Sequence, residues 1–224
     1  AWIASATPPD PTATGVPTEE VFSDDFEDGT TGAWSRTVDP VYALFLDPLN
    51  GSFTNDAAPD LLLRLSSPLG VGVDPATLVI TQGGAEVDVT CQVTLPFATC
   101  TPDQPFAEGQ VVLEAAVADT LGNISPADDL VFTVDQTDPS ITVTSPADGL
   151  VTSAGTVLFE GTVSETADLL LDGQAVTVQP DLTWSAQVAL DEGGNTFQLI
   201  ATDPAGNFGN ANLLVIRDTT APLP

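Results

Sequence analysis

The chain has 224 residues, of which 42% are hydrophobic, and its 32 acidic residues against three basic ones give a formal net charge of −29. This balance strongly disfavours nucleic-acid binding and attachment to anionic membranes, because both need clustered Lys or Arg. The chain also lacks His and Lys, which removes Ser-His and Lys-based nucleophilic catalysis.

Residues 1–36 are predicted to form an extended segment that is rich in proline and acidic residues. Four prolines stand within residues 7–18 and favour a polyproline-like linker. Phe22, Phe26 and Trp34 follow in an acidic stretch and are candidate anchors for assembly. Two interpretations stay open. The segment packs on, or adds a strand to, a neighbouring subunit in head-to-tail assembly, or it folds back on its own chain.

From residue 37 onward the sequence repeats a set of turn motifs in the same order, which indicates two homologous modules at about 37–136 and 137–220. A C-terminal linker, residues 221–224, follows them. In each module apolar residues alternate with polar ones, as in residues 183–190, and turns containing Gly recur between the alternating runs. This pattern predicts an all-β fold of two tandem immunoglobulin-like β-sandwiches, with about seven strands each.

Cys91 and Cys100 flank a short turn and are predicted to form a disulfide. Closing a loop of this size stabilises a fold by roughly 2–3 kcal/mol in the chain-entropy model. A disulfide implies an oxidising compartment, and no apolar run approaches the ~20 residues of a membrane span. We therefore expect an extracellular protein without membrane insertion. The start at Ala1 indicates a processed chain or an excerpt of a longer one.

The second module carries the motifs ITVTSPADG (141–149), LDG (171–173), EGGNT (192–196), ATDPAGN (201–207) and DTTAP (218–222). Together they resemble bacterial immunoglobulin-like domains, which occur in tandem arrays on surface proteins and large adhesins. The first module is similar to a sister type through GVDPATL (72–78) and DTLGN (119–123), although its cysteine pair is not part of that pattern. The resemblance implies β-sandwiches in series and a secreted or bacterial cell-surface location. It also implies adhesive, spacer or fibre-forming roles and, in some relatives, calcium at the joints between domains.

Acidic and amide side chains recur at the turns and linkers that close each module, and calcium is the one cofactor that we expect. The candidate ligands are Asp119, Asn123, Asp135 and Asp138 around the first joint, and Asp203, Asn207 and Asp218 around the second. Calcium takes such oxygen ligands, and a loop and a linker at the same end of a sandwich would hold the ion. The alternative is turn chemistry alone, in which Asp and Asn cap their own turns and Gly supplies a positive φ.

The densest acidic run, residues 24–28, contains the carboxylates that glycoside hydrolysis uses, but such runs are more typical of a solvated face. The sequence also has no phosphate-binding glycine motif. We therefore expect a non-catalytic protein, either the subunit of a surface fibre, which self-associates head to tail or contacts other surface proteins, or an adhesin stalk. The alternative is an accessory immunoglobulin-like region of a larger secreted enzyme. A carbohydrate-binding module is disfavoured, because the chain has only three Trp and one Tyr.

Overall fold

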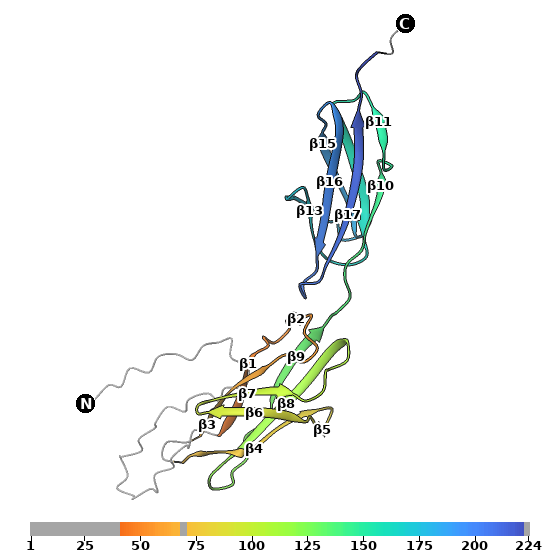
Figure 1. Ribbon diagram of the computed structural model, residues 1–224. Coiled ribbons are helices and arrows are strands. Elements are labelled where there is room, and N and C mark those ends of the chain that lie inside the picture. Colours follow the sequence, from red (N-terminus) through yellow and green to blue (C-terminus); the bar gives the residue numbers. More distant parts are fainter. Residues whose placement is uncertain (1–40, 68–70, 222–224) are drawn as a thin grey trace, which may run out of the picture. The chain divides into compact units, whose positions relative to one another are not determined.

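The computed structural model of the chain describes residues 41–67 and 71–221 (Figure 1). These residues form seventeen β-strands and no α-helix, so the all-β prediction is confirmed. By their contacts the described residues divide into two compact units, the first with residues 41–51, 58–67, 71–105 and 111–131, the second with residues 52–57, 106–110 and 132–221. Among the described residues, no helix has the length and apolar character needed to span a bilayer.

The first sandwich consists of two sheets with the strand orders β1-β3-β7-β6 and β2-β9-β8-β4-β5. The pairs β1–β3, β3–β7, β6–β7, β4–β8 and β4–β5 are antiparallel, whereas β2 runs parallel to β9. The strands are β1 (Tyr42–Asp47), β2 (Phe53–Thr54), β3 (Leu61–Ser66), β4 (Val73–Gln82), β5 (Ala85–Glu86), β6 (Val89–Thr94), β7 (Phe97–Pro102), β8 (Gly109–Asp119) and β9 (Asp128–Val134). This is the sheet order of an immunoglobulin sandwich, with short strands added at two sheet edges.

The alternation of residue types in β8 explains why this segment forms a strand. Val111, Leu113, Ala115 and Val117 are buried, whereas Glu114 between them is exposed. Because successive side chains of a strand point to opposite faces, this spacing gives β8 one apolar face that packs into the core.

The second sandwich has a three-stranded sheet, β10-β12-β15, and a five-stranded sheet, β11-β17-β16-β13-β14. In its core the rings of Phe159 and Phe197 meet edge to face, with centroids 4.9 Å apart. Trp184 is buried opposite Gly161, where an added Cβ would lie 2.6 Å from the indole ring. The strands are β10 (Ile141–Ser145), β11 (Leu150–Thr152), β12 (Thr156–Val163), β13 (Asp168–Leu171), β14 (Gln174–Val176), β15 (Thr183–Ala189), β16 (Gly193–Thr202) and β17 (Phe208–Arg217).

The number of strands differs from the prediction of about seven per module. The described residues give nine strands to the first sandwich and eight to the second. The added strands, β2, β5, β11 and β14, are only two or three residues long. A run of that length is too short to show the period of two from which a strand is recognised in a sequence.

Three of the residues named from the sequence fall outside the description. The predicted extended segment 1–36, with the candidate anchors Phe22, Phe26 and Trp34, precedes the described residues, and of the C-terminal linker only Ala221 is described. The module boundaries at residues 36/37 and 136/137 stay predictions.

Candidate metal centre

The turn between β16 and β17 holds Asp203 and Asn207 as a buried pair, with exposed fractions of 6% and 8%. The Asn207 backbone N–H donates to Asp203 Oδ1 at 2.9 Å, and Asn207 Nδ2 donates to Asp203 Oδ2 at 2.8 Å. Gly206 in this turn has φ +93°, a conformation that glycine adopts without steric cost. The motif DPAGN therefore orients one carboxylate and one amide within a tight turn.

Asp135 approaches this turn from the segment that connects β9 and β10. Asn207 Nδ2, which donates to Asp203, also donates a hydrogen bond to the backbone carbonyl oxygen of Asp135, at 2.8 Å. Its backbone N–H donates to Thr54 O at 2.9 Å, and its carboxylate Oδ1 accepts from the Thr137 N–H at 3.1 Å. All of these residues belong to the second compact unit. The Asn207 amide thus holds Asp135 and Asp203 side by side.

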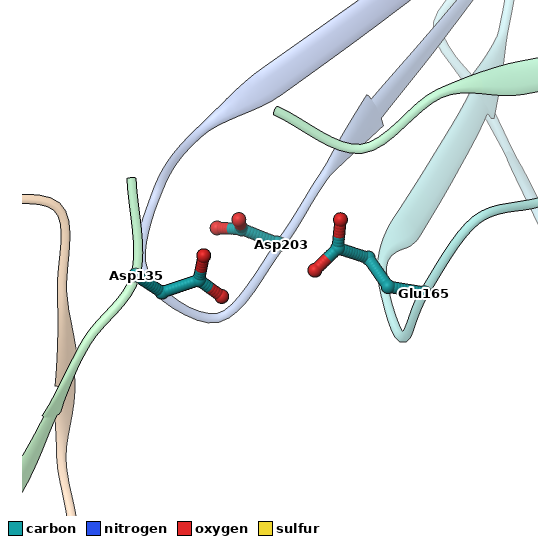
Figure 2. A group of neighbouring side chains, drawn as sticks. All are labelled: Asp135, Glu165 and Asp203. Carbon is teal, nitrogen blue, oxygen red and sulfur yellow. The ribbon is translucent and has the colours of Figure 1, made fainter. Parts of the chain in front are cut away.

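Glu165, in the loop between β12 and β13, supplies a third carboxylate. One carboxylate oxygen from each of Asp135, Glu165 and Asp203 lies within 4.8 Å of the other two. Figure 2 shows the three side chains directed toward a common space from three separate segments. We call these three residues the acidic trio. Carboxylate oxygens that converge in this way are the ligands that calcium prefers.

The electrostatics of the acidic trio favour a bound cation. Burial raises the pKa of Glu165 above its ordinary value, and the negative charges of Asp135 and Asp203 raise it further. The hydrogen bond from Ser164 Oγ, 3.5 Å long, acts in the opposite direction. An ionised Glu165 is therefore in an unfavourable environment, which a cation among the three carboxylates would reverse.

The corresponding turn of the first sandwich, between β8 and β9, pairs Asp119 with Asn123. Asp119 Oδ1 accepts from the Leu121 and Asn123 backbone N–H groups, both at 2.9 Å, and Oδ2 accepts from Asn123 Nδ2 at 2.8 Å. The bond from the Asn123 side chain contributes most to lowering the pKa of Asp119 below its usual value. In the described part of the chain, the acidic trio is the one cluster of three potential ligands, and it does not include Asp119. These are the bonds by which Asp and Asn cap their own turn.

The structure corrects the way in which the sequence grouped the candidate ligands. Asn207 precedes β17 and Asp218 follows it, so this ten-residue strand separates them by roughly 30 Å. Asn123 and Asp135 stand at opposite ends of β9 in the same manner. The prediction that the turn and the following linker share one end of a sandwich was therefore wrong. Asp138 and Asp218 are both exposed and are not part of the acidic trio.

Glu165 is the member of the acidic trio that the sequence did not reveal. It lies in no turn motif, and its neighbours Ser164 and Thr166 are ordinary loop residues. The signal that would have found it is topological. In an immunoglobulin-like sandwich the loop between strands B and C and the turn between strands F and G lie at the same end. Here these are the loop between β12 and β13 and the turn between β16 and β17. An acidic residue in each of them is therefore brought into proximity.

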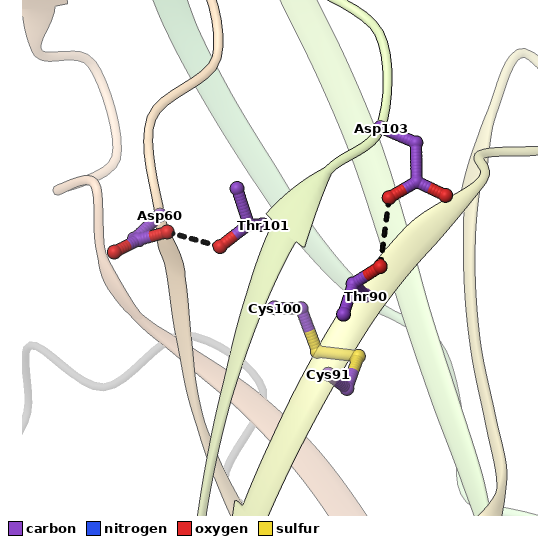
Figure 3. The surroundings of a disulfide bond; sticks show 6 residues. All are labelled: Asp60, Thr90, Cys91, Cys100, Thr101 and Asp103. Atoms are coloured by element: carbon purple, nitrogen blue, oxygen red, sulfur yellow. Dashed lines mark hydrogen bonds between the residues drawn. A yellow bond between two sulfur atoms is a disulfide. The ribbon is translucent and has the colours of Figure 1, made fainter.

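Cys91 on β6 and Cys100 on β7 lie directly opposite each other and form a disulfide, with their Cα atoms 4.0 Å apart. Cys100 is fully buried, and two Thr-Asp hydrogen bonds flank the bridge (Figure 3). The first of these joins Thr90 Oγ1 to Asp103 Oδ1 at 2.8 Å. The disulfide ties the edge strand β6 to its sheet, at a position where the second sandwich has no corresponding strand.

Comparison with known sequences finds similarity over parts of this chain. The model of the family described as Glucodextranase, domain B, matches residues 139–218. Bacillopeptidase F of Bacillus subtilis (strain 168) is 33% identical over 102 residues, which make up 45% of this chain and 7% of that protein. This chain therefore corresponds to a small part of that relative.

Among solved structures, fibronectin(III)-like modules of Clostridium thermocellum CbhA align with a TM-score of 0.49 and 16% identity, over 79% of this chain and 94% of that one. The I-band fragment I67–I69 from titin aligns with a TM-score of 0.52 and 10% identity, over 78% of this chain and 65% of that one. At such identities the titin alignment supports the fold and gives no information about function.

Proposed function

We propose that this chain, which consists of tandem bacterial immunoglobulin-like modules, is a non-catalytic extracellular spacer within a surface or secreted protein. The observation that carries the proposal is the acidic trio together with Asn207, whose side chain joins two segments of the backbone. Asn207 donates both to Asp203 and to the Asp135 carbonyl, so the cluster fixes the segment before β10 against the turn before β17. The disulfide between Cys91 and Cys100 supports an oxidising, extracellular location.

Calcium is the ion that the acidic trio would bind. The three carboxylates are hard oxygen ligands, and extracellular modules bind calcium with dissociation constants of about 10⁻⁴–10⁻³ M. A bound ion would neutralise the charge around Glu165 and tie Asp135 to Asp203 more firmly. A spacer that stiffens in the calcium of the extracellular medium is the functional consequence.

Head-to-tail self-association is the partner interaction that we propose. Residues 1–36 precede the described sandwiches and carry Phe22, Phe26 and Trp34, three large apolar side chains in an acidic stretch. Docking of these anchors on a neighbouring copy would join copies into a fibre. Because the chain has a net charge of −29, assembly requires cations that screen the repulsion between copies or bind to them.

An accessory region of a larger enzyme is the second candidate function. It is favoured by the similarity of 102 residues to part of Bacillopeptidase F and by the family match over residues 139–218. In that case the spacer would separate a catalytic domain from another part of the same chain. The complete reading frame distinguishes the two candidates, because a catalytic domain encoded beside these modules favours the accessory role.

Light scattering after size-exclusion chromatography tests the proposed function. The chain would be measured at millimolar calcium and in chelator, beside a variant that lacks residues 1–30. Large species in calcium that dissociate in chelator and that the shortened variant does not form support cation-dependent head-to-tail assembly. A monomer in both conditions rejects self-association and leaves the spacer role within a larger protein. Polymers that persist without residues 1–30 contradict the assignment of Phe22 and Phe26 as anchors.

A further inference from the structure

The four-stranded sheet of the first sandwich presents apolar side chains on the face that points away from the core. On β3, Leu63 and Leu65 are buried, whereas Arg64 between them is exposed. Leu44 of β1 and Phe97 of β7 both lie opposite Arg64 in the register of the neighbouring strands. Opposite residues of neighbouring strands point to the same side of a sheet, so Leu44, Arg64 and Phe97 form a row across this outer face. We call these three residues the central row.

Two further apolar residues flank the central row. Tyr42 stands two residues before Leu44, and Leu62 two residues before Arg64, so both point to the same outer face. Phe97 has an exposed fraction of 45%, and Tyr42, Leu44 and Leu62 are half-buried. We call Tyr42, Leu62 and the central row together the outer patch. Aromatic residues and Arg are the types that are enriched where proteins contact one another.

Arg64 is the one charged residue of the outer patch. Of the two basic residues that the structure describes, Arg217 is half-buried and donates to Leu190 O at 3.2 Å, whereas Arg64 is exposed. Within residues 41–67 and 71–221 Arg64 forms no ion pair. Among the residues of β1, β3, β6 and β7 the one carboxylate is Asp47, at the end of β1. An exposed cation among apolar side chains favours a ligand that is both acidic and apolar.

The corresponding sheet of the second sandwich, β10-β12-β15, has no such patch. On its outer face Glu160 lies opposite Ser185, and Thr162 lies opposite Thr183, all four of them exposed. Apart from Leu158, the large apolar residues of its three strands are not exposed. Hydroxyl groups and a carboxylate therefore stand on the outer face of this sheet, so the outer patch is a property of the first sandwich and not of the shared architecture.

Residues 19–28 of the chain have the composition that the outer patch favours. Their sequence, EEVFSDDFED, contains six acidic residues together with the candidate anchors Phe22 and Phe26. The sequence predicts an extended conformation here, in which Phe22, Asp24 and Phe26 point to the same side. This order of apolar, acidic and apolar side chains matches the central row, where a cation stands between two apolar side chains.

We propose that residues 19–28 dock on the outer patch of their own chain, with Asp24 paired to Arg64 and the two Phe side chains packed beside it. The connecting residues 27–40 lead to Val41, which directly precedes β1. Fully extended, they span up to about 45 Å, whereas the central row begins on β1 itself. A tether of this kind gives an effective concentration on the order of 1 mM. Docking on the same chain is therefore favoured over docking on another copy at lower protein concentrations.

Docking on the same chain competes with the proposed head-to-tail assembly, because both use Phe22 and Phe26. In a separate copy the anchors would be held on the first sandwich, and they would have to leave it before they could reach a neighbouring copy. This regulatory consequence rests on the proposed function, whereas the docking itself does not.

A labelled peptide with the sequence of residues 17–30 tests the docking. Fluorescence anisotropy measures its binding to the full chain and to the variant that lacks residues 1–30, in chelator and at concentrations where light scattering shows separate copies. The shortened variant is expected to bind the peptide. The full chain should bind it at least about tenfold more weakly, because its own segment competes for the same patch. No binding by the shortened variant, or equal affinity for both chains, overturns the proposal.

A charge exchange tests the assignment of Arg64. In the shortened variant, Arg64→Glu should weaken peptide binding by about tenfold or more, since like charges then face each other. A peptide with Asp24→Arg should regain binding to this variant, which a folding defect would not allow. The matched control Thr162→Glu adds an acidic residue to the outer face of the second sandwich and should leave binding unchanged. Unaltered binding after Arg64→Glu overturns the proposal. A lack of polymers in calcium contradicts the proposed function and does not alter these outcomes.

Discussion

The two Asp-x-x-Gly-Asn turns of this molecule have nearly the same internal hydrogen bonds and different surroundings. In both turns the Asn backbone N–H and side chain donate to the two carboxylate oxygens of the Asp. Asn123 is exposed and bonds within its own turn, whereas Asn207 is buried and also donates to the Asp135 carbonyl. The motif therefore specifies the turn, and the segments packed around it determine whether the turn takes part in a larger site.

The sequence carries part of this difference. Pro40 stands two residues before β1, as Pro139 stands two residues before β10, and counting back four residues from each proline gives Arg36 and Asp135. The first module thus has a cationic residue at the sequence position where the second has a carboxylate. Tyr42 lies opposite Ser66 as Ile141 lies opposite Val163, and two residues after these partners the sequence has Pro68 in the first module and Glu165 in the second. At both sequence positions the first module therefore lacks the carboxylate that the second module has.

Calcium should stabilise the second unit and leave the first unchanged. At a calcium concentration about 100-fold above the dissociation constant, binding raises the free energy of unfolding by about 2.7 kcal/mol. Thermal unfolding in calcium and in chelator measures the shift. Asp203→Asn should abolish it, while the matched change Asp119→Asn should weaken the first unit and leave the shift intact. A shift that survives Asp203→Asn would place the ion elsewhere.

Removing the disulfide should destabilise the first unit and leave the second unchanged. Replacing Cys91 and Cys100 by Ser together is expected to lower the free energy of unfolding of the first unit by about 2–3 kcal/mol, through the greater entropy of the unfolded chain. The second unit contains no cysteine and should keep its stability. Denaturant unfolding with hydrogen exchange as the local probe separates the two units. An equal loss in both would mean that the units unfold as one cooperative block.

Asn207 and Asn123 stand in equivalent turns with different surroundings, so the stability cost of the same substitution can be compared at the two positions. Asn207→Ala should cost about 2–3 kcal/mol, because it removes the side-chain donor to Oδ2 of the buried Asp203 and to the Asp135 carbonyl, whereas Asn123→Ala should cost about 1 kcal/mol. Chemical denaturation in chelator measures both losses. Similar costs at the two positions would show that the contact of Asn207 with Asp135 contributes little.

The smallest expected effect is a gain in stability. Glu165→Gln should raise the free energy of unfolding in chelator by about 0.5 kcal/mol, because it removes a partly exposed charge next to two others. The pKa of Glu165 is raised in the folded state, so its ionised form is destabilising above that pKa. The gain is therefore expected at neutral pH and should vanish as the pH falls toward the unfolded value, near 4.5.

Asp119 should show the opposite dependence on pH. Its folded-state pKa is lowered, so it contributes stability above the unfolded value of 3.8 and loses that contribution as the pH falls through the folded value. Unfolding measured between pH 7 and pH 2 for the parent chain, Glu165→Gln and Asp119→Asn tests the two signs. A loss of stability in Glu165→Gln at neutral pH would contradict the repulsion described for the acidic trio.

The fold was predictable from the sequence because its longer strands alternate clearly. The run of residues 183–190 places Trp184, Ala186 and Val188 on one face, and β15 follows that pattern. The acidic trio was harder to predict from the sequence. Asp203, Asn207 and Asp135 were named because they stand in turn and linker motifs, but their grouping depends on which strand ends meet. Glu165 has no local signature, since only the sheet order brings its loop to the β16–β17 turn.

We propose that the second turn, with Asp203, belongs to a calcium site and that the first turn, with Asp119, does not. Calcium titration by isothermal calorimetry, at neutral pH on the parent chain, Glu165→Gln and Asp119→Asn, tests it most directly. We expect one calcium site per chain, greatly weakened in Glu165→Gln and unchanged in Asp119→Asn. No heat of binding in the parent chain, or equal affinity in parent and Glu165→Gln, would contradict it.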